Sequence, residues 1–150
     1  MSKTINICWN GFLKKGVEAY PNEICAFLFS ENIYSEEEVW HVYQVKNISD
    51  EPKGNWVPDK KEMKKVKDDA RKKGYVKLGN IHTHPYPEDE VYDEDVMKKD
   101  VIVPSDKDLS YARRFGDVVR GIVCVGKGAV YDVLFHDMFG NKINVLVVEK

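Results

Sequence analysis

The order of apolar and polar residues along this chain predicts strands and helices that intermingle. The apolar run from Ile24 to Phe29 is typical of a buried strand. Residues 38–47 alternate between apolar and polar side chains, which predicts a second strand. Four later segments also have β-type patterns, and glycine-containing turns join the last three of them: residues 75–84, 119–126, 129–135 and 142–148.

Helical spacing marks two other segments. Residues 8–20 place apolar side chains three and four positions apart, and Pro21 ends this segment. Asp59 and Glu62 have the spacing of a capping box and begin a second helix, which Gly74 stops.

A third, short helix is expected from Ser105 to about Phe115. This mixture of elements predicts an α/β (mixed α+β) class. A chain of 150 residues is long enough for one core, so we expect a single domain over residues 1–150.

Bulk composition narrows the classes of function. A net charge of −2 gives no general attraction to nucleic acid or anionic membranes. Three scattered cysteines argue against a disulfide framework and for a reducing compartment. The N-terminal residues do not resemble a signal peptide, and the longest apolar run is far too short to cross a membrane. We therefore expect a cytoplasmic protein.

Charge is unevenly distributed in two segments. Residues 86–103 hold seven acidic and two basic side chains, and are interpreted as a solvated loop or as a lid beside a site for basic substrates. Residues 59–73 hold eight basic and four acidic side chains without interleaved aromatic residues, which favours a solvated helix face over a nucleic-acid surface.

The segment His82-Thr83-His84-Pro85 is the strongest chemical signal. Side chains alternate along a strand, so both imidazoles point to one face. Two imidazoles and a carboxylate, with one position left for water, make an open catalytic zinc site. A second carboxylate, not bound to the metal, would serve as the proton shuttle.

Three further residues are candidates for this site. Ser105 and Asp108 have the spacing of a helix N-cap and its N3 carboxylate, and the same helix start would present both side chains rigidly. Glu23 opens the apolar strand, where a surface carboxylate is the simpler interpretation. Cys25, two residues on, is a conceivable nucleophile, although its neighbours are typical of a buried core.

Together these residues resemble the JAMM motif of the MPN+ (Mov34/JAB) metalloprotease family, in its prokaryotic and archaeal stand-alone form. The family pattern is a glutamate in a P-x-E context, then H-[ST]-H-P, then S-x-x-D. The matching pieces, in the same order, are Pro21–Glu23, His82–Pro85 and Ser105–Asp108. The likeness spans about residues 5–135, and it implies the MPN fold, a curved, partly closed β-sheet flanked by helices.

The resemblance also implies roles for the residues. His82, His84 and Asp108 would hold one Zn²⁺ per chain, Glu23 would be the general base, and Ser105 would stabilise the oxyanion. In such a site zinc lowers the pKa of its bound water to about 7. The glutamate takes a proton from that water during its attack and returns it to the leaving amine.

Two features depart from the family pattern. Twenty residues separate His84 from Ser105, where the family usually has about seven. This insertion is the acidic segment at about 86–103, so an aspartate within it is an alternative to Asp108 as the third ligand. The alternative ligands in this segment are Asp89, Asp93 and Asp95. The second departure is Ala26, which stands where the family commonly has glycine.

The leading functional hypothesis is a zinc isopeptidase that hydrolyses the amide bond between a ubiquitin-like modifier tail and a lysine amine. Its partners would be conjugates of ubiquitin-like or sulfur-carrier proteins, with neither nucleic acid nor a membrane. A second hypothesis is cleavage of a small amide from the tail of a sulfur-carrier protein. A third is a non-catalytic MPN scaffold that binds partner proteins; such scaffolds typically lose ligand residues, which this chain retains.

Overall fold

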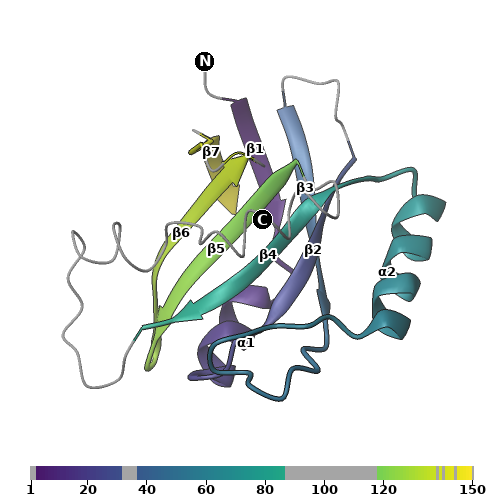
Figure 1. The fold of residues 1–150 in the computed structure, drawn as a ribbon. Helices are drawn as coiled ribbons and strands as arrows, with labels where there is room; N and C mark the ends of the chain where they lie inside the picture. Colours follow the sequence, from purple (N-terminus) through teal and green to yellow (C-terminus); the bar gives the residue numbers. More distant parts are fainter. Residues whose placement is uncertain are drawn as a thin grey trace.

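A computed structural model describes residues 3–31, 37–86, 118–137, 139, 141–143 and 145–149 of this protein. In these residues one seven-stranded sheet, ordered β6-β5-β4-β2-β3-β1-β7, carries two helices (Figure 1). The mixed α+β class is therefore confirmed. The elements are β1 (Lys3–Cys8), α1 (Phe12–Ala19), β2 (Cys25–Ser30), β3 (Glu37–Val45), α2 (Lys60–Lys72), β4 (Val76–Pro85), β5 (Val119–Gly126), β6 (Ala129–Asp137) and β7 (Val145–Glu149).

The sheet mixes parallel and antiparallel pairs. β2 runs antiparallel to both β3 and β4, and β5 runs antiparallel to β6. β4 and β5 are parallel, as are β1 and each of its neighbours, β3 and β7. β4 is an interior strand, paired with β2 on one side and β5 on the other, and it is buried from Leu78 to Thr83.

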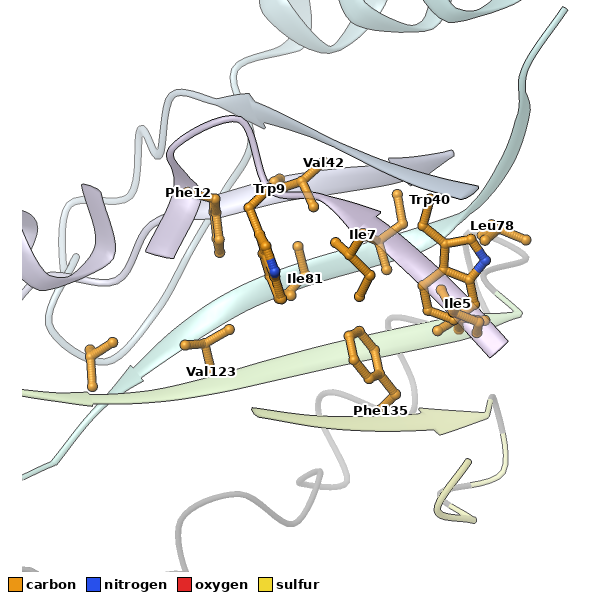
Figure 2. Packing of buried hydrophobic residues seen from close by; sticks show 14 residues of the cluster. Ile5, Ile7, Trp9, Phe12, Trp40, Val42, Leu78, Ile81, Val123 and Phe135 are labelled. Carbon is orange, nitrogen blue, oxygen red and sulfur yellow. The ribbon is translucent and has the colours of Figure 1, made fainter. Parts of the chain in front are cut away.

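The sheet is curled, and a contact between two rings shows it. Trp40 on β3 and Phe135 on β6 are four strand positions apart, which is about 19 Å in a flat sheet. Their ring centroids nevertheless lie 5.4 Å apart at an interplanar angle of 80°. Figure 2 shows Phe135 pointing from β6 toward Ile7 of β1 and Trp40 of β3. The curved, partly closed sheet expected from the resemblance is therefore confirmed.

The concave face of the sheet holds the larger apolar core. Side chains from β1 to β6 fill it, and Leu13 and Val17 of α1 and Tyr20, which follows the helix, pack against it. The buried cluster is Ile5, Ile7, Trp9, Phe12, Ala26, Leu28, Trp40, Val42, Leu78, Ile81, Val119, Val123, Val125 and Phe135.

The convex face carries α2 over a second cluster. Ala70 of α2 is buried there against side chains of β2 and β3, including Phe27 and Val45. Asp59 caps the helix as predicted, because its carboxylate accepts from the backbone N–H groups of residues 61 and 62. Glu62 does not complete a capping box; its carboxylate instead accepts the backbone N–H of Lys46 over 2.7 Å.

The N-terminal segment differs most from the sequence prediction. The helix expected over 8–20 begins only at Phe12, and β1 precedes it. Asn10 and Gly11 have φ angles of 52° and 80°, which an α-helix does not allow, so the chain turns there. β1 was missed because its pairing is non-local: it lies parallel to β3 and β7, which are distant in the sequence.

The cysteines and the helices bear on two further expectations. Cys8, Cys25 and Cys124 are free thiols, which agrees with the prediction that the fold uses no disulfide framework. Among the described residues, neither helix has the length and apolar character needed to cross a membrane.

Candidate metal centre

β4 presents the two histidines on the convex face. His82 pairs with Cys25 of β2 and with Ile122 of β5, and His84 pairs with Cys124 of β5. The intervening Thr83 points to the opposite face, as strand alternation requires. The imidazoles are neighbours, with ring centroids 4.9 Å apart, and only 1% of His82 is exposed. The sequence prediction that both histidines share a face is confirmed.

Glu23 reaches the histidines through strand register. The antiparallel pairing of Cys25 with His82 continues to Ile24, whose backbone N–H and C=O both bond to Thr83. One residue further, Glu23 lies opposite His84 and on the same face as Cys25. Glu23 is 5% exposed, so it is not the surface carboxylate that the simpler interpretation predicts.

The three side chains together form a candidate metal site. One donor atom from each of Glu23, His82 and His84 lies within 4.8 Å of the others. Nε2 of His82 is 3.8 Å from Oε1 of Glu23. Two zinc–ligand bonds of about 2.1 Å span about 4.2 Å, so the two imidazoles could share one ion, with the Glu23 carboxylate close enough to reach the ion or a water bound to it. Two imidazoles and a carboxylate are a donor set that zinc favours.

The strand carrying the histidines is tied to the segment carrying Glu23 on both sides. The Thr83 hydroxyl accepts the backbone N–H of Ile24 over 2.9 Å. The hydroxyl of Tyr20 donates to the backbone carbonyl of Tyr86, which follows the His-Thr-His-Pro segment. The middle threonine therefore has a structural role while its two neighbours face the site.

Trp56 lies over His82, a candidate ligand, on the convex side of the sheet. Its ring stacks on His82 with centroids 5.5 Å apart and an interplanar angle of 26°. Trp56 belongs to the loop between β3 and α2, residues 46–59, and is 8% exposed. A buried aromatic ring here excludes water from one side of the imidazole and limits its rotation.

Arg120 of β5 lies behind His82. Its Nη2 atom is 3.3 Å from Nδ1 of His82, and the residue is 1% exposed. A guanidinium nitrogen can only donate, so Nδ1 supplies a lone pair and Nε2 is the nitrogen that faces Glu23. The second nitrogen of a metal-bound histidine usually donates to an acceptor. A cationic donor at this position is unusual for a metal site.

His136 of β6 is paired with Arg120 across the strands and is 3% exposed. Among the described atoms its Nδ1 is buried without a hydrogen-bond partner. Burial, followed by the positive charge of Arg120, lowers the pKa of His136 below its ordinary value. The imidazole is therefore held in its neutral form at neutral pH.

The thiol of Cys25 is unsuited to nucleophilic chemistry. Burial, and next the nearby carboxylate of Glu23, raise its pKa to about 12. Its S–H lies 3.6 Å from the carbonyl of Val45. A thiol that stays protonated at neutral pH is a weak nucleophile, so the core interpretation of Cys25 is the better one.

The remaining predicted site residues lie outside the described part of the chain. These are Ser105 and Asp108, together with the acidic segment from residue 87 onward and its alternative ligands Asp89, Asp93 and Asp95. Their assignment stays a prediction.

Sequence reasoning missed three residues around the site. An isolated arginine within the otherwise apolar run of β5 was a usable signal for Arg120, because a charge in a buried strand needs a reason. Trp56 and Asn47 lie in a polar loop and gave no comparable signal.

Comparisons with known proteins agree with this geometry. The sequence matches the family described as prokaryotic homologues of the JAB domain over residues 8–97. The chain belongs to this family. The resemblance to JAB/MPN domains predicted from the motif is thereby confirmed.

Solved structures share the fold at low sequence identity. A JAB1/MPN domain protein of Archaeoglobus fulgidus superposes with a TM-score of 0.58 at 21% identity, covering 97% of this chain and 99% of its own. A protein of Desulfitobacterium hafniense gives a TM-score of 0.61 at 20% identity, covering 98% and 94%. One of Salinibacter ruber gives 0.56 at 19%, covering 100% and 92%. A search of curated protein sequences gives no match. At these identities the structural matches show a shared fold.

Proposed function

We propose that this JAB-family protein is a zinc-dependent isopeptidase or peptidase that hydrolyses the amide bond between a ubiquitin-like modifier tail and a lysine amine. The observation that carries the proposal is the convergence of Glu23, His82 and His84, whose donor atoms lie within 4.8 Å of one another. JAB-family membership, shown by the match over residues 8–97, supports the same chemistry.

His82 and His84 would hold the metal, with Asp108 as the predicted third ligand. Zinc bound there would activate water and polarise the scissile carbonyl. Because Glu23 is opposite His84 on the same face, its carboxylate can take a proton from the attacking water and return it to the leaving amine. Ser105 is the predicted donor to the oxyanion.

The first experiment measures zinc per chain by elemental mass spectrometry, because it does not depend on knowing a substrate. We expect about one zinc per chain, lost in His82→Ala, His84→Ala and Asp108→Ala. Asp93→Ala and His41→Ala serve as controls that keep zinc; His41 bonds to Glu31 at 2.7 Å and lies outside the cluster. No zinc in the wild-type protein, even after metal is added, would contradict the proposal.

Activity is then measured on a panel of lysine-linked conjugates and tail-extended fusions. Glu23→Gln keeps the shape of the side chain, so zinc should stay bound while turnover falls by about 100-fold or more. Product mass spectrometry distinguishes modifier release from cleavage of a small amide on a sulfur-carrier tail. Full zinc occupancy with stable modifier binding and no turnover would favour the scaffold alternative.

A further inference from the structure

We propose that Asn47 is a positioning residue that holds the backbone of Glu23, and with it the carboxylate, opposite His84. The proposal rests on the proposed function in taking Glu23 as the base. The geometry that supports it lies in the loop between β3 and α2 (residues 46–59), which no sequence motif includes.

The pairing of β2 with β4 ends at Ile24, and the backbone N–H and C=O of Glu23 itself both bond outside the sheet. Its N–H donates instead to the carbonyl of Pro52 over 2.6 Å. Its carbonyl accepts from Nδ2 of Asn47 over 2.9 Å. Both bonds come from the β3–α2 loop, so this loop positions the Glu23 backbone beyond the last sheet contact at Ile24.

The Asn47 amide uses its full hydrogen-bonding capacity at this position. Nδ2 donates to the carbonyls of Glu23 and Asn55, at 2.9 and 3.1 Å. Oδ1 accepts from the N–H groups of Ser49 and Val57, at 3.0 and 2.9 Å. Two donors and two acceptors on one planar group are what an amide provides.

This pattern fixes both the amide orientation and the residue type. A flipped amide would face two carbonyls with its oxygen and two N–H groups with its nitrogen. Aspartate has the same shape, but it would place a carboxylate oxygen against the carbonyls of Glu23 and Asn55. Asn47→Asp is therefore a nearly isosteric way to break the contact.

The same amide holds the base of the loop that carries Trp56. The loop is closed by two backbone bonds, from Ile48 N–H to the carbonyl of Val57 at 2.8 Å and from Asp59 N–H to that of Lys46 at 2.9 Å. Asn47 fills the space between these ends, and Trp56 reaches over to stack on His82. Asn47 thus connects Glu23, the proposed general base, with the loop that places Trp56 over His82.

The expected consequence is greater for turnover than for binding. A general base must lie about 2.6–3.2 Å from the proton it takes, and a misplacement of about 1 Å can cost about 100-fold in rate. The histidines lie on β4, and the sheet holds them without the loop. Loss of the Asn47 bonds should therefore displace Glu23 while the metal ligands stay in place.

The test compares Asn47→Asp and Asn47→Ala with Ser49→Ala in the zinc-loaded protein. Ser49→Ala is a matched control, because it removes one hydrogen bond of the same loop, from Glu51 N–H to Ser49 Oγ, without touching Glu23. We expect kcat to fall about tenfold or more in both Asn47 variants. KM and zinc affinity should stay within about twofold, and Ser49→Ala should resemble wild type. Because an unfolded fraction would also lower the apparent kcat at unchanged KM, kcat is calculated per folded, zinc-loaded chain.

A second readout needs no substrate. In protein labelled with 5-fluorotryptophan, ¹⁹F NMR gives one resonance for each of Trp9, Trp40 and Trp56, and Trp56→Phe assigns the last. Zinc should shift the Trp56 resonance in the wild type and in Ser49→Ala. In the Asn47 variants that resonance should broaden and lose its response to zinc. Trp9 and Trp40 belong to the concave core, so their unchanged resonances verify the fold.

The outcomes are distinct from those that test the proposed function. If no conjugate is cleaved by the wild type, the proposed function fails and the ¹⁹F experiment alone decides the role of Asn47. If both Asn47 variants kept the wild-type Trp56 resonance and the wild-type kcat, the positioning role would be overturned. Loss of the Trp9 and Trp40 resonances in both variants would also overturn it, because Asn47 would then be required for folding itself.

Discussion

Nη2 of Arg120 lies 3.3 Å from Nδ1 of His82, so a buried cation stands directly behind a candidate metal ligand. Arg120 and His82 are each 1% exposed. Charges interact strongly where water is excluded, so this arrangement affects metal binding more than a surface arginine would.

We expect Arg120→Met to bind zinc more tightly than the wild type, by about tenfold or more. The substitution removes a positive charge near a dication, and it removes a donor that faces the Nδ1 atom of His82. Affinity is measured by competition with a chromophoric chelator. Arg71→Met is the matched control, because it makes the same change in charge on an exposed side chain of α2. Weaker zinc binding by Arg120→Met would mean that the guanidinium orients His82 productively.

Replacement by alanine should strongly lower the stability of the protein at one glycine and leave it unchanged at another. A Cβ on Gly79 of β4 would lie 1.8 Å from the backbone oxygen of Val119 on β5, so Gly79→Ala forces the two strands apart. We expect urea denaturation to show a loss of about 3 kcal/mol or more, or no folded protein at all. Gly54 lies in the β3–α2 loop with no atom within 4 Å of such a Cβ. Gly54→Ala should therefore stay within about 0.5 kcal/mol of wild type.

The sequence predicted the parts of the fold that depend on local pattern. β5 was predicted with its observed limits, and the start of α2 at Asp59 followed from its capping side chain. The contact of Glu23 with the histidines followed from the motif, and register now explains it: Cys25 pairs with His82. β1 was missed because its pairing partners are distant in the sequence. Arg120 was visible as a charge in an apolar strand, but its contact with His82 joins residues that are distant in the sequence.

Cys25 and Cys124 should resist alkylation in the folded protein. Burial raises the pKa of each thiol to about 12, so at pH 8 only about one thiol in 10,000 is ionised. Cys8 is partly exposed and should react first with iodoacetamide. Mass spectrometry of the native protein should show at most one fast site, whereas urea-unfolded protein should react at all three. Rapid native modification of Cys25 would revive the thiol nucleophile.

His136 should make the protein less stable as the pH falls. Its pKa in the folded state is lowered by burial and by Arg120, and further by Lys142, while Asp137 acts in the opposite direction. The unfolded chain, with an ordinary pKa of about 6.5, then binds more protons than the folded one. Stability contributed by neutral His136 is therefore present above this pKa and is lost as the pH falls below it.

Thermal unfolding from pH 7.5 to pH 5 measures this contribution. The Tm of the wild type should decrease over that range, and the decrease should be smaller in His136→Asn, which cannot titrate. His41→Asn is the matched control, because it removes a histidine far from Arg120, and its decrease should follow that of the wild type. Equal slopes for His136→Asn and wild type would assign the acid sensitivity to other groups.

The contact between Trp40 and Phe135 has a consequence beyond the core itself. These rings bring the edge strand β6 against β3, and two of the strands that bend between them, β4 and β5, carry the histidines and Arg120 on the convex side. A change of curvature on the inner side must alter the spacing of side chains on the outer side. Substitutions at Trp40 or Phe135 would therefore change the distance between the candidate metal ligands without touching them.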